Sequence, residues 1–211
     1  MADELVFYTH PMSRGRIVRW MLEELGQPYR TELLEYDTTM KAPAYLAVNP
    51  MGKVPALRHG DAVITEAGAI CTYLADEFPK AKLNIPVGDP RRGVYLKWLF
   101  FGPSCVEPAI AERAFPRKEA PSRAALGFGD FDTVVDVLAR AAAAADPYLL
   151  GAQFTAADVI IGSGLRWGTM FKLLPERPEF KSYLTTLAAH AALQRTTAKD
   201  AALQKQQEAT G

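Results

Sequence analysis

The run Asn49–Leu57, which reads NPMGKVPAL, joins a turn to the start of a short strand. Asn-Pro followed by Gly52 is typical of a turn, and Val54 enters the strand. Pro55 has no N–H, and the peptide bond before a proline can be cis at a cost of only about 0.5–1 kcal/mol. A strand that stops so abruptly leaves the N–H and C=O of Val54 facing outward, where an extended peptide could pair with them. The alternative is a plain turn before a strand.

A second pattern is the segment Thr65–Ile70, which begins a predicted helix with an acidic residue. The N-terminus of a helix offers free N–H groups and the positive end of a dipole, so it suits a carboxylate. Glu66 could in turn bind an ammonium group of the same ligand. The alternative is the acidic first turn of a helix that binds nothing.

The third pattern is the segment Pro11–Arg16, between the first predicted strand and the first predicted helix. Ser13 fits the N-cap of that helix, and local sequence alone favours this interpretation. A hydroxyl at this place could also hydrogen-bond a thiolate. The helix dipole and Arg14 or Arg16 would then lower the pKa of a thiol from its usual value of about 8.5 toward neutrality. Thr9, His10 and Arg14 are close enough in sequence to compete for this role.

The elements that must position these residues alternate between strand and helix over the first eighty residues. Helical spacing of apolar residues ends at Gly26, a C-terminal cap, and a short helix or irregular segment precedes the Asn49 turn. The order predicts a compact α/β unit with a mixed sheet. Strands are expected at 5–8, 29–34, 54–57 and 62–64, with a turn at 58–61, and helices at 17–25 and 66–78.

Beyond residue 80 the composition changes. Residues 79–90 are rich in proline and read as a linker, and every strong pattern after them is helical. The polar tail, residues 199–211, is expected to fray. Helices are expected at 91–101, 122–145, 155–169 and 179 to about 207.

Composition argues against several classes of function. Lys plus Arg and Asp plus Glu are both 24, so the chain lacks the basic field that a nucleic acid or an anionic membrane surface requires. No run approaches the roughly 20 apolar residues of a membrane-spanning helix, and no signal peptide is visible. Neither the 2 cysteines nor the 3 histidines have the spacing of a metal site or a dithiol motif. We therefore expect no metal, and Cys71 is expected to pack in a core.

The Asn49–Leu57 run, followed by Glu66 at the start of a helix, resembles the cytosolic glutathione transferase family. The segment Leu150–Asp158, which reads LGAQFTAAD, adds a match to the capping box of that family, formed here by Thr155 and Asp158. The resemblance spans nearly the whole chain. It implies an α/β plus all-α fold, with an N-terminal thioredoxin-like domain (βαβαββα, mixed sheet) at 1–80, a linker at 81–90 and an all-helical domain at 91–211.

The resemblance also implies roles for single residues. The bond before Pro55 would be cis, and the main chain of Val54 would pair with the cysteinyl part of glutathione. Glu66 and Ala67 would hold the γ-glutamyl end. Ser13 would hydrogen-bond the sulfur, as in the serine-type classes. The basic residue near the glycyl carboxylate would be Lys41 or Lys53.

One position departs from the family pattern. Serine usually follows the glutamate, whereas this chain has Ala67. The main-chain N–H survives, but a side-chain hydrogen bond worth on the order of 1 kcal/mol is lost. This departure weakens the expectation of tight glutathione binding.

A second substrate would bind against the helical domain, in a pocket that one sequence outlines poorly. The alternative for its candidate residues is packing in the core or at a dimer interface. The candidates are His10, Phe101, Cys105, Arg166 and Trp167.

The expected function is transfer of glutathione to a small hydrophobic electrophile, with glutathione as co-substrate, in a cytoplasmic homodimer that serves detoxification. One alternative is another glutathione-dependent enzyme on the same scaffold, such as a peroxidase, a dehalogenase or an isomerase. The other is a non-catalytic protein that binds a ligand or a partner.

Overall fold

The computed structural model describes residues 4–119 and 121–210. Contacts divide this described part into two compact units, one within residues 1–81 and 191–211 and the other within residues 82–190. The last helix thus groups with the N-terminal unit, although it is far from it in sequence. The domain boundaries given above (1–80, 81–90 and 91–211) stay a prediction.

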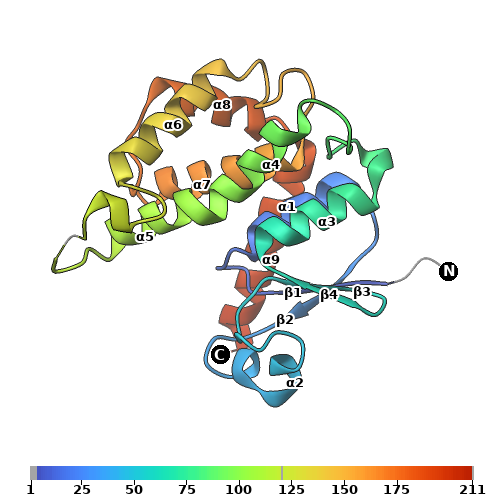
Figure 1. The fold of residues 1–211 in the computed structure, drawn as a ribbon. Helices are drawn as coiled ribbons and strands as arrows, with labels where there is room; N and C mark the ends of the chain where they lie inside the picture. Colours follow the sequence, from blue (N-terminus) through green and yellow to red (C-terminus); the bar gives the residue numbers. More distant parts are fainter. Residues whose placement is uncertain (1–3, 120, 211) are drawn as a thin grey trace. The chain divides into compact units, whose positions relative to one another are not determined.

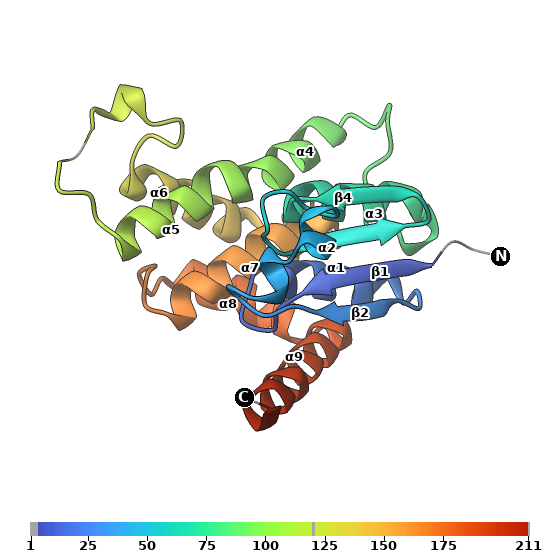
Figure 2. The ribbon, with the colours of Figure 1, turned by 90° about the horizontal axis from the view of Figure 1, so that it is seen from below.

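The first unit contains in chain order β1 (Leu5–Thr9), α1 (Gly15–Leu25), β2 (Arg30–Leu33), η1 (Thr39–Lys41), α2 (Pro43–Leu46), β3 (Ala56–His59), β4 (Ala62–Thr65), α3 (Ala67–Glu77), η2 (Pro79–Ala81) and α9 (Ala191–Thr210). Among the described residues four strands form one sheet in the order β2-β1-β3-β4 (Figure 2). β1 is parallel to β2, and the other neighbours are antiparallel, so the sheet is mixed as predicted.

Helices cover both faces of this sheet. Figure 1 shows α1 and α3 together on one face and α2 on the other side. Phe7, Leu57 and Ile70 are fully buried, so strands and helices share one apolar core. Cys71 is also fully buried, as predicted, and burial raises the pKa of its thiol. Helix α9 packs along α1.

Two local predictions in this unit have different outcomes. Helix α1 ends at Leu25, and Gly26 adopts a φ of 66° while its N–H bonds the Leu22 carbonyl at 3.2 Å, so the predicted cap is confirmed. The predicted four-residue hairpin turn is wrong. Arg58 and His59 continue β3 because they pair with Val63 and Ala62, which leaves a shorter turn.

The second unit is helical throughout its regular elements. It contains α4 (Arg92–Phe101), the wide turn η3 (Gly102–Val106), α5 (Glu107–Ala114), η4 (Arg123–Ala125), α6 (Phe131–Ala144), α7 (Ala156–Met170) and α8 (Pro178–Ala188). α4 packs on α7, and α6 packs on α8. The predicted capping box of α7 is confirmed: the Asp158 carboxylate accepts the Thr155 N–H at 2.9 Å. Asp158 also accepts the Tyr183 hydroxyl at 2.8 Å, which ties α7 to α8.

The predicted helix at 122–145 is too long. The regular helix starts only at Phe131, because Asp130 caps it by accepting the Thr133 N–H at 2.9 Å. Gly129 just before this cap has a φ of 77°, a conformation that ends helical geometry.

The predicted helix from 179 to about 207 is two helices, α8 and α9. The chain breaks at His190, whose ring lies 4.2 Å from that of Phe154 and whose Nε2 lies 2.9 Å from the Tyr148 hydroxyl. The predicted fraying of the tail is also wrong for the described residues, since α9 continues to Thr210. Residue 211 lies outside the described residues.

The strand and helix order of the first unit and the helical second unit confirm the predicted fold class, thioredoxin-like followed by all-helical. Within residues 4–119 and 121–210, no helix is both long enough and apolar enough to cross a bilayer. The same residues contain no cluster of three or more histidine, cysteine or acidic side chains suited to a metal ion.

Candidate functional site

The sheet register brings the three sequence motifs to the same end of the sheet. Tyr8 near the end of β1 lies opposite Ala56, the first residue of β3, and Ala56 lies opposite Thr65, the last residue of β4. The loop after β1, the turn before β3 and the start of α3 therefore leave the sheet on the same side. Ser13, Val54 and Glu66 are on these three segments.

The turn before β3 is held by side chains from within the first unit. The Tyr45 hydroxyl and the Asn49 amide both donate to the Lys53 carbonyl, at 2.6 and 2.7 Å. Burial raises the pKa of Tyr45 to about 12, so this hydroxyl keeps its proton and stays a donor. The turn is therefore fixed on the side away from Val54.

Gly52 is required in this turn by conformation and by space. Its φ is 56°, and its N–H bonds the Asn49 carbonyl at 2.8 Å. A Cβ here would lie 2.9 Å from Lys41 Nζ and 3.0 Å from the Met40 carbonyl oxygen. Lys41 Nζ donates to the Gly52 carbonyl at 2.7 Å, so the exposed ammonium is already anchored beside the turn. Lys53 is exposed as well.

Val54 is joined to Pro55 by a cis peptide bond, as the resemblance implied. Val54 is half-buried, whereas Pro55 is buried. Within residues 4–119 and 121–210, neither the main-chain N–H nor the C=O of Val54 has a hydrogen-bond partner. An unpaired main-chain donor and acceptor at the start of a strand can accept one more extended chain.

Helix α3 begins at Ala67 with an unusual residue before it. Glu66 has φ 68° and ψ 122°, a conformation that costs a residue with a side chain on the order of 1–3 kcal/mol. Its side chain is exposed. No side chain among the described residues caps this end of the helix. The first N–H groups of α3 thus remain available to an anion.

The loop between β1 and α1 has the opposite character. The Ser13 hydroxyl donates to the His10 carbonyl at 2.6 Å and accepts the Gly15 N–H at 2.9 Å. It therefore bonds the first N–H of α1, but the residue directly before the helix is Arg14, so the predicted N-cap position of Ser13 is wrong by one residue. To hydrogen-bond a sulfur, this hydroxyl must exchange the His10 carbonyl for it.

Thr9 and Gly15 show how closely this loop is packed. Thr9 is fully buried, and a Cβ on Gly15 would lie 2.0 Å from its Oγ1. The Thr9 carbonyl accepts the Leu34 N–H at 2.9 Å. Thr9 is thus a packing residue beneath the loop.

His10 is held by three neighbours. Its Nδ1 accepts the Met12 N–H at 3.1 Å, its ring lies 4.4 Å from that of Tyr36, and its Nε2 lies 3.8 Å from a Glu35 oxygen. Burial lowers the pKa of His10, and the opposing effect of Glu35 is smaller. The neutral ring, with Nδ1 as acceptor, fits this arrangement.

The other four residues proposed for a second substrate lie in the second unit, and all are half-buried. The Phe101 ring contacts Trp98 edge-on at 5.6 Å, and the Trp167 ring lies 4.8 Å from Phe171. Cys105 lies in η3 with its sulfur 3.6 Å from the Ser104 hydroxyl. Arg166 alone of these four lines an open hollow of about 1010 Å³ between α7 and α8.

Sequence reasoning missed several residues that shape the site. Tyr45 carried no signal, since its hydroxyl reaches Lys53 only through the fold. Asn49 stood in the recognised motif, but its amide bond to Lys53 was not foreseen. Asp200 was assigned to a polar tail, although it is buried at 2% exposure.

Comparisons with known proteins agree with this arrangement. The family described as glutathione S-transferase, N-terminal domain, matches residues 12–77, a range that includes Ser13, Val54 and Glu66. The glutathione S-transferase-like protein OpS6 of Beauveria bassiana is 28% identical over 204 residues, which cover 88% of this chain and 90% of OpS6.

Solved structures give the same result over the full fold. A glutathione transferase from Methylococcus capsulatus has a TM-score of 0.76 and 27% identity, covering 93% of this chain and 98% of its own. The glutathione transferase URE2P6 from Phanerochaete chrysosporium, in complex with oxidised glutathione, has a TM-score of 0.79 and 26% identity, covering 95% and 98%. Residues 12–77 thus match the N-terminal domain of glutathione S-transferases, and the fold of the chain is similar to that of solved glutathione transferases.

Proposed function

We propose that this protein binds glutathione and transfers it to small hydrophobic electrophiles. The observation that carries the proposal is that the N–H and C=O of Val54 are unpaired at the same end of the sheet as the uncapped start of α3. Glutathione is an extended tripeptide with a carboxylate and an ammonium at one end and a second carboxylate at the other. Its main chain and charged groups match the polar groups at this end of the sheet.

Each part of glutathione has a partner in the proposal. The cysteinyl main chain pairs with the N–H and C=O of Val54 beside Pro55. The γ-glutamyl carboxylate binds the first N–H groups of α3, at Ala67, and its ammonium binds Glu66. The glycyl carboxylate is left near Lys41 or Lys53. This distribution gives every charge of the ligand an opposite partner.

The chemistry follows from the place of the thiol. Paired at Val54, the cysteinyl side chain would reach the loop that carries Ser13, at the N-terminus of α1. The Ser13 hydroxyl turns from the His10 carbonyl to the sulfur and, with the helix dipole, stabilises the thiolate. The thiolate then attacks the electrophile, forming a carbon–sulfur bond while a leaving group departs or an addition is completed. The protein contributes thiolate stabilisation and proximity.

A second candidate function is glutathione binding without catalysis. Two observations favour it: the Ser13 hydroxyl proton is already donated to His10, and Ala67 replaces the serine that the family usually has. A peroxidase, a dehalogenase or an isomerase would use the same thiolate, so substrate profiling separates these from a transferase. The homodimer, the cytoplasmic location and the role in detoxification stay predictions.

The test is a thermal melt with reduced glutathione and, in parallel, with S-methylglutathione, followed by a conjugation assay with a generic aromatic electrophile. A ligand at 100 times its Kd stabilises by about 2.7 kcal/mol. We expect both compounds to raise Tm and only reduced glutathione to react. Stabilisation without turnover of any electrophile would favour the non-catalytic candidate. No stabilisation by either compound would refute glutathione binding.

A further inference from the structure

Helix α9 carries a carboxylate that is buried beneath the Ser13 loop. Asp200 Oδ1 accepts Nε of Arg19 at 2.6 Å, and the two residues are 2% and 1% exposed. They are 181 positions apart in sequence. Arg19 Nη1 also reaches the Tyr29 and Thr31 hydroxyls at 3.3 and 3.4 Å, and its guanidinium lies over the Phe7 ring.

Two polar atoms of this buried ion pair lack hydrogen bonds. Within the described residues, Arg19 Nη2 and Asp200 Oδ2 have no hydrogen-bond partner. Burying a charged pair costs solvation that only good geometry and further hydrogen bonds offset, so such a pair is weak evidence of a purely stabilising role. The unmade hydrogen bonds of this pair therefore indicate a role beyond holding α9 to α1.

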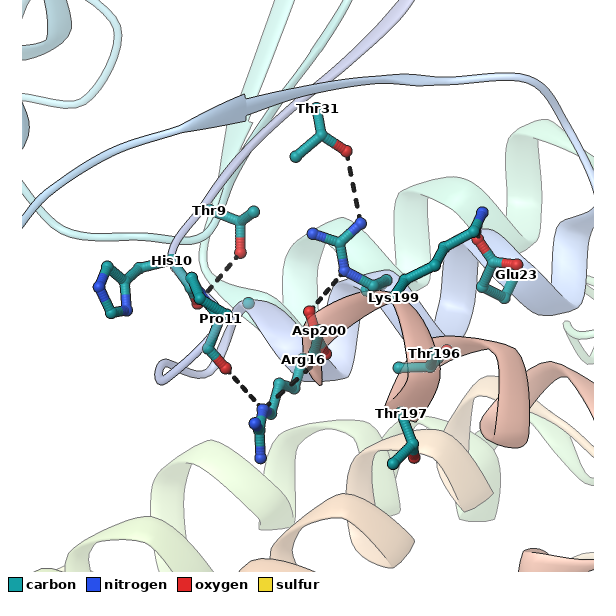
Figure 3. Close-up of polar contacts among 12 residues, drawn as sticks. Thr9, His10, Pro11, Arg16, Glu23, Thr31, Thr196, Thr197, Lys199 and Asp200 are labelled. Carbon is teal, nitrogen blue, oxygen red and sulfur yellow. Dashed lines mark hydrogen bonds and ion pairs between the residues drawn. The ribbon is translucent and has the colours of Figure 1, made fainter. Parts of the chain in front are cut away.

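Arg16 connects this buried pair to the site. Its Nε donates to the Pro11 carbonyl at 2.6 Å and lies 3.8 Å from Asp200 Oδ2, the oxygen that lacks a hydrogen bond. Figure 3 shows the Arg16 side chain between Pro11 and Asp200. The same carboxylate accepts the hydrogen bond from Arg19. The negative charge of Asp200 thus attracts the guanidinium that holds the loop carbonyl.

The held carbonyl belongs to the loop that carries the proposed hydroxyl. Pro11 stands between His10, whose carbonyl accepts the Ser13 hydroxyl, and Met12, whose N–H bonds the His10 ring. The same helix reaches this neighbourhood again near its end. Gln207 donates to Glu35, whose other oxygen faces His10 at 3.8 Å.

We propose that Asp200 is a positioning residue: through Arg16 it fixes the Pro11 carbonyl, and so places the Ser13 hydroxyl for the glutathione sulfur. This inference rests on the proposed function for its catalytic consequence. Asp200 touches neither glutathione nor the reacting atoms in this scheme. Its effect passes through the loop, and the C-terminal helix becomes part of the machinery of the N-terminal unit.

The chain offers a matched control on the same pair of helices. Arg195 on α9 donates to the Glu23 carbonyl at 2.8 Å and pairs with the buried Glu23 carboxylate at 3.1 Å. Arg16 makes the same two kinds of contact, with a carbonyl and with an acid of the facing helix. Both arginines are partly exposed, but in the part of the chain that the structure describes Arg195 makes no contact with the Ser13 loop.

The experiment compares Arg16→Met, Asp200→Asn and Arg195→Met in the full chain. Arg16→Met is the main variant, because it leaves Arg19 and Asp200 paired and the fold intact. Hydrogen exchange of the peptide covering residues 10–16 is measured without ligand, and kcat and KM for glutathione are measured with a generic electrophile. We expect faster exchange in the peptide and a fall in kcat on the order of tenfold, with KM little changed, in Arg16→Met and Asp200→Asn. Arg195→Met should lower Tm alone.

The two proposals fail in different ways. If the wild type shows no glutathione binding or turnover, the proposed function fails, and the exchange data still test the positioning of the loop. If Arg16→Met leaves exchange of residues 10–16 unchanged, or if Arg195→Met alters exchange and kcat as strongly as Arg16→Met, Asp200 only holds the helices together. Either of these results overturns the inference.

Discussion

The two halves of the proposed glutathione site differ in how their polar groups are used. On the side of β3 and α3, the N–H and C=O of Val54 and the first N–H groups of α3 have no hydrogen-bond partner within the described residues. On the side of the β1–α1 loop, the Ser13 hydroxyl both donates and accepts, and the His10 ring accepts the Met12 N–H. One half is open to a ligand, whereas the other is already satisfied internally.

This difference separates binding from chemistry. A ligand that pairs with open groups gains hydrogen bonds without breaking any in the protein, so the β3–α3 side can supply affinity directly. The loop side must exchange one hydrogen bond for another, a change with a net cost on the order of 1 kcal/mol or less. Substitutions on the two sides should therefore change different quantities: Kd on the first, and kcat on the second.

The largest expected effect is that of Ser13→Ala. Loss of the hydroxyl removes the donor to the thiolate, and we expect kcat/KM to fall about 100-fold, while the Kd for glutathione changes little. Because Ser13 also bonds the first N–H of α1, Tm should fall with a loss of about 1 kcal/mol of stability. Steady-state kinetics and calorimetric binding check this. Unchanged turnover would show that another group stabilises the thiolate.

Glu66→Gln should act on the other side. It removes the charge that faces the γ-glutamyl ammonium, so the Kd should rise about tenfold, equivalent to roughly 1.4 kcal/mol, with kcat preserved at saturating glutathione. The control is Asp61→Asn. Asp61 is an exposed acid in the β3–β4 turn, at the opposite end of these strands from the proposed site. If Asp61→Asn raised the Kd for glutathione as much as Glu66→Gln, the effect would come from the net charge of the protein and not from a contact with Glu66.

Ala67→Ser should strengthen binding by a smaller amount. The new hydroxyl can bond the γ-glutamyl carboxylate at the start of α3 and add about 1 kcal/mol, or roughly fivefold in Kd. Titration calorimetry of the two proteins checks this. Ala69→Ser, two residues further along α3 at an exposed position, provides the matched control. A weaker affinity in Ala67→Ser would contradict the placement of the carboxylate.

The smallest expected effect is a pH dependence that originates in the loop. Burial lowers the pKa of His10 below its ordinary value of 6.5, so the unfolded chain binds this proton more readily than the folded one. The stability that His10 contributes is present above pH 6.5 and is lost as the pH falls through its folded-state pKa. Protonation also removes the Nδ1 acceptor of the Met12 N–H.

His10→Gln provides the check, because a glutamine can accept the same N–H without titrating. Tm is measured for both proteins as the pH falls through and below 6.5. The plot of Tm against pH for the variant should lack the part of the decrease just below pH 6.5 that His10 causes. A slope that is the same in both proteins would place its origin in other groups.

The fold class and the open half of the site were predictable from sequence. Gly26, the Asn49–Pro55 turn and the start of α3 all depend on interactions within a few residues, which short patterns carry. Only one of the two hydrogen bonds of the Ser13 hydroxyl was predictable from sequence. Its place beside the start of α1 is local and was foreseen, although the N-cap itself is Arg14, and the bond to the His10 carbonyl depends on the path of the loop.

Two of the errors, at residues 179–207 and in the tail, share a physical origin. The pattern of residues 179–207 gave no sign of a break, yet the chain stops being helical at His190, whose ring packs against Phe154. The tail gave no apolar stripe, yet α9 persists because Asp200, Glu23 and their partners tie it to α1. In both cases contacts distant in sequence outweighed the local pattern.

The sequence by itself determined the order of strands and helices in the first eighty residues, the turns at Gly26 and Gly52 and the capping box of α7. Each of these is encoded by neighbouring residues, because propensities, caps and turns act over one or two helical turns. Only the tertiary structure decided that Asp200 is buried against Arg19 and that Arg16 lies between it and the Pro11 carbonyl. A buried ion pair between distant residues exists only once packing has excluded water around both charges, and no local pattern specifies where that occurs.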